Sequence, residues 1–342
     1  MTTTESATPL RIAVLGVGRI GTMHAEIIAR QIPGAALAMV QDVNGDGAAA
    51  VGTALGVPFT SDLADVWSNP DVDAVAICSS TDTHVDLLIG AALAGKAIFC
   101  EKPISLDLAK VDSALAVVAE AGVPLQIGFN RRFDPAHASV RDAVLTGAVG
   151  DVHMVRITSR DPAPPPIAYV KVSGGLFLDM MIHDFDMARF VTGSEVVDVF
   201  TKAAVRVDPA IGEAGDVDTA VVVLTHENGC ITTIDNSRQA VYGYDQRVEA
   251  FGSGGMAASE NPLAHTGLRR SAAGTSQQTI PYFFLDRYLP SYIAEWKAFV
   301  DYVRSGGPSP VDAQSGRAPL LIGLAAGISA REGRIVPLAE IG

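Results

Sequence analysis

Gly16-Val17-Gly18-Arg19-Ile20-Gly21 is the stretch of sequence that decides the fold. It follows the apolar run Leu10–Leu15 and opens a helical pattern over Ile20–Gln31. A G-x-G-x-x-G between a strand and a helix is typical of a dinucleotide-binding βαβ unit. The first glycine makes the tight turn, the second lets the backbone approach a pyrophosphate, and the third permits close packing of the helix on the strand. The amide groups at the helix N-terminus are then available to the phosphates.

The region around this stretch continues the alternation of short apolar runs and helical patterns, which predicts a doubly wound parallel sheet. We expect strands over Leu10–Leu15, Ala36–Gln41, Ala74–Cys78, Ala97–Cys100 and Leu125–Phe129, and helices over Ile20–Gln31, Thr83–Ala94 and Leu106–Ala121. The predicted fold class is therefore α/β, with an N-terminal Rossmann domain over residues 1–128.

The pattern changes after residue 128. The segments Val217–His226 and Cys230–Arg238 flank an Asn-Gly pair, which is a strong hairpin signal. Short turns favour antiparallel neighbours, because parallel strands need crossovers. We expect residues 129–342 to form a substrate-binding and oligomerisation domain of the α+β type with a large open antiparallel sheet. We also expect a flexible loop over Gly267–Gln278 and two closing helices over Tyr288–Arg304 and Gln314–Arg331.

The composition limits the possible partners. The chain has 342 residues, 48% of them hydrophobic, and a formal net charge of −13. That length allows two cored domains, and that charge argues against nucleic acid and anionic membrane surfaces. Cys78, Cys100 and Cys230 have no paired or metal-ligand spacing, so we expect buried thiols and no metal. The polar N-terminus does not resemble a signal peptide, and we expect a cytoplasmic protein.

Asp42 stands at the end of the second predicted strand, where an acidic side chain accepts hydrogen bonds from ribose hydroxyls. Its charge would repel a 2′-phosphate, and no arginine immediately follows it. The sequence therefore predicts NAD in preference to NADP.

Asp179 and His183 are four positions apart, so in a helix they lie on one face, one turn from each other. An imidazole oriented by a carboxylate can remove a hydroxyl proton at neutral pH. A histidine satisfied inside a helix and an acidic solvated face (Asp179, Asp184, Asp186) are the alternatives. Lys102 follows an apolar strand at the ligand-binding edge of the predicted sheet, although taken alone it favours the interpretation of a surface lysine.

Several further stretches carry a family resemblance. They are Cys100-Glu101-Lys102-Pro103, Gly128–Asp134, the G-G-x-F-x-D-x-x-I-H-D run over Gly174–Asp184, Val241–Asp245 and Phe283–Tyr288. Together with the glycine-rich opening, they resemble the Gfo/Idh/MocA oxidoreductases over nearly the whole chain from Leu10 onward. The last two stretches are most similar to the branch of that family that acts on inositols.

The resemblance implies an NAD-dependent dehydrogenase that oxidises a cyclic polyol, myo-inositol or a related inositol, to the ketone. It implies a proton-transfer set of Lys102, Asp179 and His183, and a dimer or tetramer of identical chains. The implied cofactor-binding residues are Gly16, Gly18, Arg19, Ile20, Gly21, Asp42, Ser79, His84 and Glu101; the implied substrate-binding residues are Arg131, Asp161, Tyr242 and Tyr244.

Other functions remain open on the same scaffold. An aldose or sugar-derivative dehydrogenase is the first alternative, and an NAD-dependent glycoside hydrolase is the second. A non-catalytic NAD sensor would have no use for Lys102, Asp179 and His183. Some inositol enzymes carry Asn where this chain has Asp161, and that exchange replaces an amide with an acceptor-only anion. The preferred stereoisomer therefore stays open.

Overall fold

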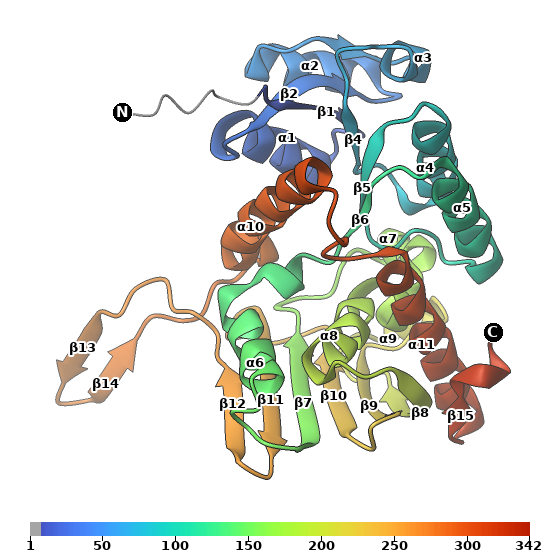
Figure 1. Cartoon of the computed structure of the whole chain (residues 1–342). Coiled ribbons are helices and arrows are strands. Elements are labelled where there is room, and N and C mark those ends of the chain that lie inside the picture. Colours follow the sequence, from blue (N-terminus) through green and yellow to red (C-terminus); the bar gives the residue numbers. More distant parts are fainter. Residues whose placement is uncertain (1–7) are drawn as a thin grey trace. The chain divides into compact units, whose positions relative to one another are not determined.

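The computed structural model describes residues 8–342, and these residues form two compact units (Figure 1). Unit 1 contains the described residues up to Phe129 together with Tyr292–Arg317. Unit 2 contains Asn130–Ser291 and Ala318–Gly342. The expected boundary at residue 128 lies one residue from this division, but the expected second domain includes Tyr292–Arg317, which the structure groups with unit 1.

Unit 1 is built on a six-stranded parallel sheet with the order β3-β2-β1-β4-β5-β6. Its strands are β1 (Leu10–Leu15), β2 (Ala35–Gln41), β3 (Phe59–Thr60), β4 (Ala74–Ile77), β5 (Ala97–Glu101) and β6 (Leu125–Gly128). Every residue of β4 is buried, as expected for a strand covered on both faces. The doubly wound order confirms the predicted α/β fold class.

The helices of unit 1 are α1 (Arg19–Gln31), α2 (Gly45–Leu55), α3 (Leu63–Trp67), α4 (His84–Leu93) and α5 (Leu108–Ala121). Local signals set their ends. Asp107 accepts hydrogen bonds from the first amides of α5, and Gly122 ends that helix with a φ of 65°. The last part of α10 (Phe284–Ser305) and the first part of α11 (Ala313–Glu332) complete the unit.

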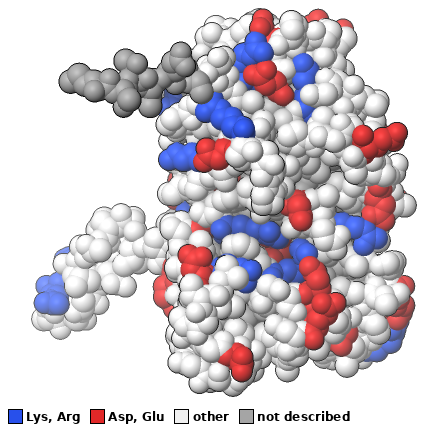
Figure 2. Space-filling view, viewed as in Figure 1, with Lys and Arg blue, Asp and Glu red and all other residues white. Residues whose placement is uncertain are grey.

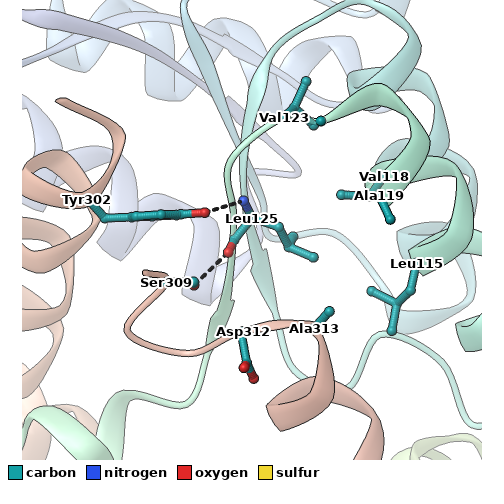
Figure 3. A pocket seen from close by; sticks show the side chains of 10 residues that line it. Leu115, Val118, Ala119, Val123, Leu125, Tyr302, Ser309, Asp312 and Ala313 are labelled. Carbon is teal, nitrogen blue, oxygen red and sulfur yellow. Dashed lines mark hydrogen bonds between the residues drawn. The ribbon is translucent and has the colours of Figure 1, made fainter. Parts of the chain in front are cut away.

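The edge strand of this sheet is covered by a loop. The Ser309 hydroxyl donates to the carbonyl of Leu125 at 2.7 Å, and the Ile127 amide donates to the carbonyl of Val311 at 3.0 Å. The Leu125 amide also lies 3.4 Å from the Tyr302 hydroxyl, which accepts from it (Figure 3). These contacts satisfy the backbone groups that an edge strand leaves unpaired.

Unit 2 is built on a seven-stranded sheet with the order β12-β11-β7-β10-β9-β8-β15. Its strands are β7 (Val152–Arg160), β8 (Val196–Ala204), β9 (Thr219–His226), β10 (Ile231–Ser237), β11 (Asp245–Gly252), β12 (Gly255–Ser259) and β15 (Val336–Pro337). The sheet is antiparallel as predicted, except that β7 and β10 pair in parallel.

One face of this sheet carries the hydrophobic core of unit 2. The core joins β7, β9 and β10 to α8 (Ile182–Thr192) through buried residues such as Ile157, Phe185, Val222 and Ile234. The other helices are α6 (Pro135–Leu145), α7 (Ile167–Ser173), α9 (Pro209–Glu213), the first part of α10 and the last part of α11.

The prediction of a flexible loop over Gly267–Gln278 is wrong. Two antiparallel strands, β13 (Leu268–Ser271) and β14 (Gly274–Gln277), form a hairpin that projects from unit 2 (Figure 1). All of their residues are exposed, so the strands lack the alternation of apolar and polar residues that marks a half-buried strand.

Charges on the surface are mixed. On the face shown in Figure 2, basic and acidic side chains lie interspersed, without a continuous basic surface. Within residues 8–342, no helix combines the length and the apolar character needed to cross a membrane.

Candidate active site

The glycine-rich turn follows β1 at the carboxyl edge of the unit 1 sheet. Gly16 has a φ of +85°, and a Cβ there would lie 2.5 Å from the Cα of Ser79. A Cβ on Gly21 would lie 1.8 Å from the carbonyl oxygen of Gly16. These two glycines are therefore required by the packing of the protein itself, as the sequence predicts.

Gly18 differs from them, because a Cβ added there meets nothing within 4 Å. The protein's own packing therefore does not explain this glycine, whereas close approach of a dinucleotide pyrophosphate would. Gly18 and Arg19 are exposed and Ile20 is half-buried, so the first turn of α1 is accessible to a ligand. The turn fits NAD, for which it would supply backbone donors.

Asp42 holds the same turn. Its Oδ2 accepts from the Val17 amide at 2.7 Å, and its Oδ1 accepts from the Asn44 amide at 2.9 Å. A carboxylate has about four acceptor positions, so these bonds leave capacity for ribose hydroxyls. Asp42 therefore links the end of β2 to the glycine-rich turn in addition to its predicted role.

His84 lies inside unit 1 with only 1% of its surface exposed. Its Nδ1 lies 2.8 Å from the carbonyl oxygen of Pro103, and its Nε2 lies 3.1 Å from that of Ser79. Burial lowers the pKa of His84. The ring therefore braces the loop after β4, where Ser79 lies, against the turn after β5, where Lys102 lies.

Glu101 is held by a buried chain of side chains that sequence reasoning missed. The indole nitrogen of Trp296 donates to Nδ1 of His24 at 2.8 Å, and Nε2 of His24 lies 2.9 Å from Oε1 of Glu101. Indole can only donate, so Nδ1 accepts and Nε2 carries the proton that His24 donates to Glu101. No sequence spacing connects His24 to Trp296, because they are 272 residues apart.

Lys102 follows β5 directly and is half-buried. Its backbone amide donates to Oε2 of Glu101 at 3.2 Å, and the Lys102–Pro103 peptide bond is cis. Gly128, opposite Glu101 on β6, leaves room for that carboxylate, since a Cβ there would lie 3.1 Å from its Cδ. The carboxylate therefore fixes the backbone from which Lys102 extends.

In unit 2, Arg131 is the centre of a buried polar cluster. Its Nη1 donates to Oδ1 of Asp184 at 2.7 Å, and its Nη2 donates to the Tyr244 hydroxyl at 3.2 Å. Asn236 on β10 donates to the other oxygen of Asp184 at 2.9 Å. Burial raises the pKa of Asp184, which the Arg131 guanidinium opposes. The predicted residues Arg131 and Tyr244 therefore lie together.

Tyr242 and Asp161 have different surroundings. Tyr242 is 46% exposed; its hydroxyl donates to Asp245 at 2.7 Å and accepts from Arg160 at 3.2 Å. Asp161 follows β7, and burial raises its pKa to about 6, against the opposing charges of Arg238 and Arg131. The structure therefore places Tyr244 inside the buried cluster, whereas the Tyr242 hydroxyl belongs to a separate network with Asp245 and Arg160.

The expectation that Asp179 and His183 share one regular helix is wrong. Asp179 lies in a π-helical turn (Leu176–Met180), and His183 lies in the first turn of α8. Gly174 and Gly175, with φ of +91° and +74°, precede this turn and interrupt the helix that ends at Ser173. Asp216 accepts from the Leu176 amide with both carboxylate oxygens at 3.1 Å. Oδ1 of Asp179 accepts from the Tyr169 hydroxyl at 3.0 Å.

Arg238 is a buried charged residue that sequence reasoning passed over. Only 1% of its side chain is exposed, and it follows β10. Its Nη1 lies 3.9 Å from Oδ2 of Asp179, and its Nη2 lies 3.7 Å from Oδ2 of Asp216. The only signal in the sequence was an arginine at the end of a predicted strand.

Two other features of the described chain are separate from these residues. A shallow cavity of about 290 Å³ lies beside α5 and is lined by residues such as Leu115, Val118 and Asp312 (Figure 3). None of the predicted site residues lines it. Among residues 8–342, no group of three or more His, Cys, Asp or Glu side chains is arranged to hold a metal. The three cysteines are buried, as predicted.

Comparison with known proteins agrees with this geometry. The family model for the oxidoreductases with an NAD-binding Rossmann fold matches residues 10–129, and that for the GFO/IDH/MocA C-terminal domain matches residues 137–258. Myo-inositol 2-dehydrogenase of Thermotoga maritima is 49% identical over 97% of this chain and 99% of its own length. Inositol 2-dehydrogenase of Rhizobium meliloti is 43% identical over 96% of this chain and 99% of its own.

A solved structure supports the same relationship. Scyllo-inositol dehydrogenase from Lactobacillus casei, with bound NAD(H) and scyllo-inositol, has a TM-score of 0.90 and 30% identity. The match covers 97% of this chain and 100% of that one. From its fold, its glycine-rich turn and these similarities, the chain belongs to the GFO/IDH/MocA family of NAD-binding oxidoreductases.

Proposed function

We propose that this protein is an NAD-dependent dehydrogenase that oxidises a cyclic polyol, myo-inositol or a related inositol, to the ketone. The observation that carries the proposal is the buried cluster of Arg131, Asp184 and Tyr244, in a chain that also has a dinucleotide-binding turn. Relatives named as inositol dehydrogenases over almost the full length support the substrate class.

The proposed chemistry divides between the cofactor and the protein. NAD⁺, when bound, supplies the hydride acceptor. We assign removal of the hydroxyl proton to His183, its orientation to Asp179, and a hydrogen bond to the reacting oxygen to Lys102. A neutral imidazole is needed for this step, since the imidazolium cannot accept a proton.

A polyol offers several hydroxyl groups, and each one that is buried unpaired costs about 1–3 kcal/mol. Arg131, Asp161, Tyr242 and Tyr244 are the proposed partners for the hydroxyls that do not react. Asp161 with a pKa of about 6 is partly protonated near that pH, so it can donate as well as accept. We propose that this property affects which inositol stereoisomer binds best.

The test is to incubate the purified protein with NAD⁺ and a panel of inositols, aldoses and glycosides while following the absorbance of reduced nicotinamide. NADH formation with an inositol, stronger than with any aldose, supports the proposal. Faster NADH formation with an aldose favours the sugar dehydrogenase alternative. Cleavage of a glycoside without net NADH favours the glycoside hydrolase.

We further propose that the chain acts in the cytoplasm as a homo-oligomer, a dimer or a tetramer, assembled through the outer face of the unit 2 sheet. Ile231, Met154, Phe251 and Met256 face one another across β10, β7, β11 and β12, and each is between 41% and 55% exposed. Such an exposed apolar row on one sheet face is typical of a protein contact. Three buried free thiols fit a reducing compartment.

A further inference from the structure

Arg238 is almost completely enclosed by unit 2, which is unusual for an arginine. The distances to Asp179 and Asp216, 3.9 and 3.7 Å, exceed those of hydrogen bonds. Among the described residues, its Nε and Nη2 make no hydrogen bond. Its interaction with this cluster is therefore mainly that of a buried positive charge.

Asp216 connects this charge to the backbone beside Asp179. Both of its oxygens accept from the Leu176 amide, which begins the π-helical turn that carries Asp179. Gly175 permits this approach, because a Cβ there would lie 2.6 Å from Oδ1 of Asp216. The close approach that Gly175 allows is thus made by a carboxylate of the protein itself.

The surroundings of Arg238 are rich in acidic groups from several elements. Asp161 follows β7, Asp216 precedes β9, and Asp179 and Asp184 lie in the π-helical turn and in α8. The other charged or titratable groups that interact with these acids are Arg131, Tyr169 and Tyr244. An opposite charge within about 4–6 Å favours the ionised form of a carboxyl group, and Arg238 lies 3.9 Å from Asp179 and 3.7 Å from Asp216.

We propose that Arg238 is a positioning residue for the proton-transfer pair, holding the carboxylate of Asp179 in place directly and through Asp216. The inference rests on the proposed function. Removing the cation takes away a charge that favours the ionised form of the surrounding carboxyl groups, Asp161 among them, and so should move the acidic limb of the activity–pH profile to higher pH. Removing the anion at Asp216 should move that limb to lower pH.

The experiment measures kcat/KM for myo-inositol against pH for the wild type and three variants. Arg238→Gln should move the acidic limb of this profile, where kcat/KM falls as the pH decreases, to higher pH by about one unit or more. Arg238→Lys keeps the charge and should leave the limb close to that of the wild type. Asp216→Asn keeps an oxygen for the Leu176 amide but loses the charge, so the limb should move downward.

Arg334→Gln is the matched control, because Arg334 of unit 2 is 41% exposed and pairs with Glu332 and Glu340, outside this cluster. It should leave the limb unchanged. Circular dichroism and NAD⁺ binding establish that each variant is folded. If Arg238→Gln does not fold, the other two variants still test the proposal. Asp216→Asn should move the acidic limb to lower pH, and Arg238→Lys should leave it in place.

If Arg238→Gln and Asp216→Asn lower kcat/KM but leave the acidic limb at the wild-type pH, Arg238 is a packing residue and the inference is overturned. Equal shifts for Arg238→Gln and Arg238→Lys would do the same. A wild type that reduces no NAD⁺ with any polyol overturns the proposed function instead, and the inference with it.

Discussion

Nε2 of His24 lies 2.9 Å from Oε1 of Glu101, and both groups are enclosed in unit 1. The indole N–H of Trp296 donates to Nδ1 of His24, so Nε2 carries the proton. Glu101 accepts from that nitrogen and also from the backbone amide of Lys102. A residue of α10 thereby supports the segment that holds a proposed catalytic lysine.

His24→Ala should lower the free energy of unfolding by about 1–3 kcal/mol, because it leaves a buried carboxylate and an indole N–H without their partner. His24→Gln should cost less, since its amide can donate to Glu101 and accept from Trp296. Denaturant unfolding of the purified variants measures both. Equal stability of wild type and His24→Ala would mean that water replaces the ring without loss.

Asp42→Asn should relax the preference for NAD over NADP. The amide keeps an acceptor for the Val17 amide but loses the charge that would repel a 2′-phosphate. Asp42→Ala should also weaken NAD binding itself, because the turn loses that bond. Titration of both cofactors by quenching of tryptophan fluorescence tests this, and an unchanged ratio of the two affinities would contradict the ribose assignment.

His183→Ala should reduce kcat by about 10²–10⁴-fold, the usual contribution of a general base. The affinity for NAD⁺ should change only a few-fold, since the glycine-rich turn and Asp42 belong to unit 1 and His183 to unit 2. Steady-state kinetics and a separate NAD⁺ titration distinguish the two effects. A variant that retains the wild-type kcat would remove His183 from the base role.

How much of this could be predicted depends on how local each signal is. Five of the six strands of unit 1 were predicted, because central strands are buried on both faces and read as apolar runs, such as Ala74–Ile77. The two-residue edge strand β3 (Phe59–Thr60) was missed, because it is short and not buried. The glycine-rich turn was predicted from a continuous six-residue motif, in which Gly16 and Gly21 are required by the protein's own packing and Gly18 is not. The motifs that carry the family resemblance likewise lie in short continuous stretches of the sequence.

The roles of Arg238 and His24 could not be predicted, because their partners come from distant parts of the chain. His24 and Trp296 are 272 residues apart in the sequence. Gly175 and Asp216, which lie in close contact, are separated in the sequence by a segment that includes β8. Asp216 also accepts from the amide that begins the π-helical turn at Asp179, where spacing alone indicated an α-helix. Helical spacing shows which residues can share a face only if the backbone stays regular.

Asp161 should make polyol binding depend on pH. Its pKa of about 6 means that it changes from mainly neutral to mainly ionised as the pH rises through that value. The KM for myo-inositol should therefore change between about pH 5 and pH 7, as expected for a carboxyl group that titrates there. In Asp161→Asn that change should disappear and the order of preference among inositol isomers should shift. Persistence of the wild-type pH dependence in Asp161→Asn would assign the titration to another group.

Met154→Glu should dissociate the proposed oligomer. Met154 is directly opposite Ile231 on β10 and Phe251 on β11, so a carboxylate there would be buried without a partner in the centre of the apolar row. Leu93→Glu is the control, because Leu93 in α4 is also exposed, at 77%, but lies in unit 1 and outside the row. Light scattering after gel filtration gives the mass of each species. A mass reduced only for Met154→Glu supports assembly through this face, because both variants add the same charge to an exposed apolar site. An unreduced mass for Met154→Glu would place the contact elsewhere, since an unpaired charge cannot stay in the centre of a packed interface without a large cost.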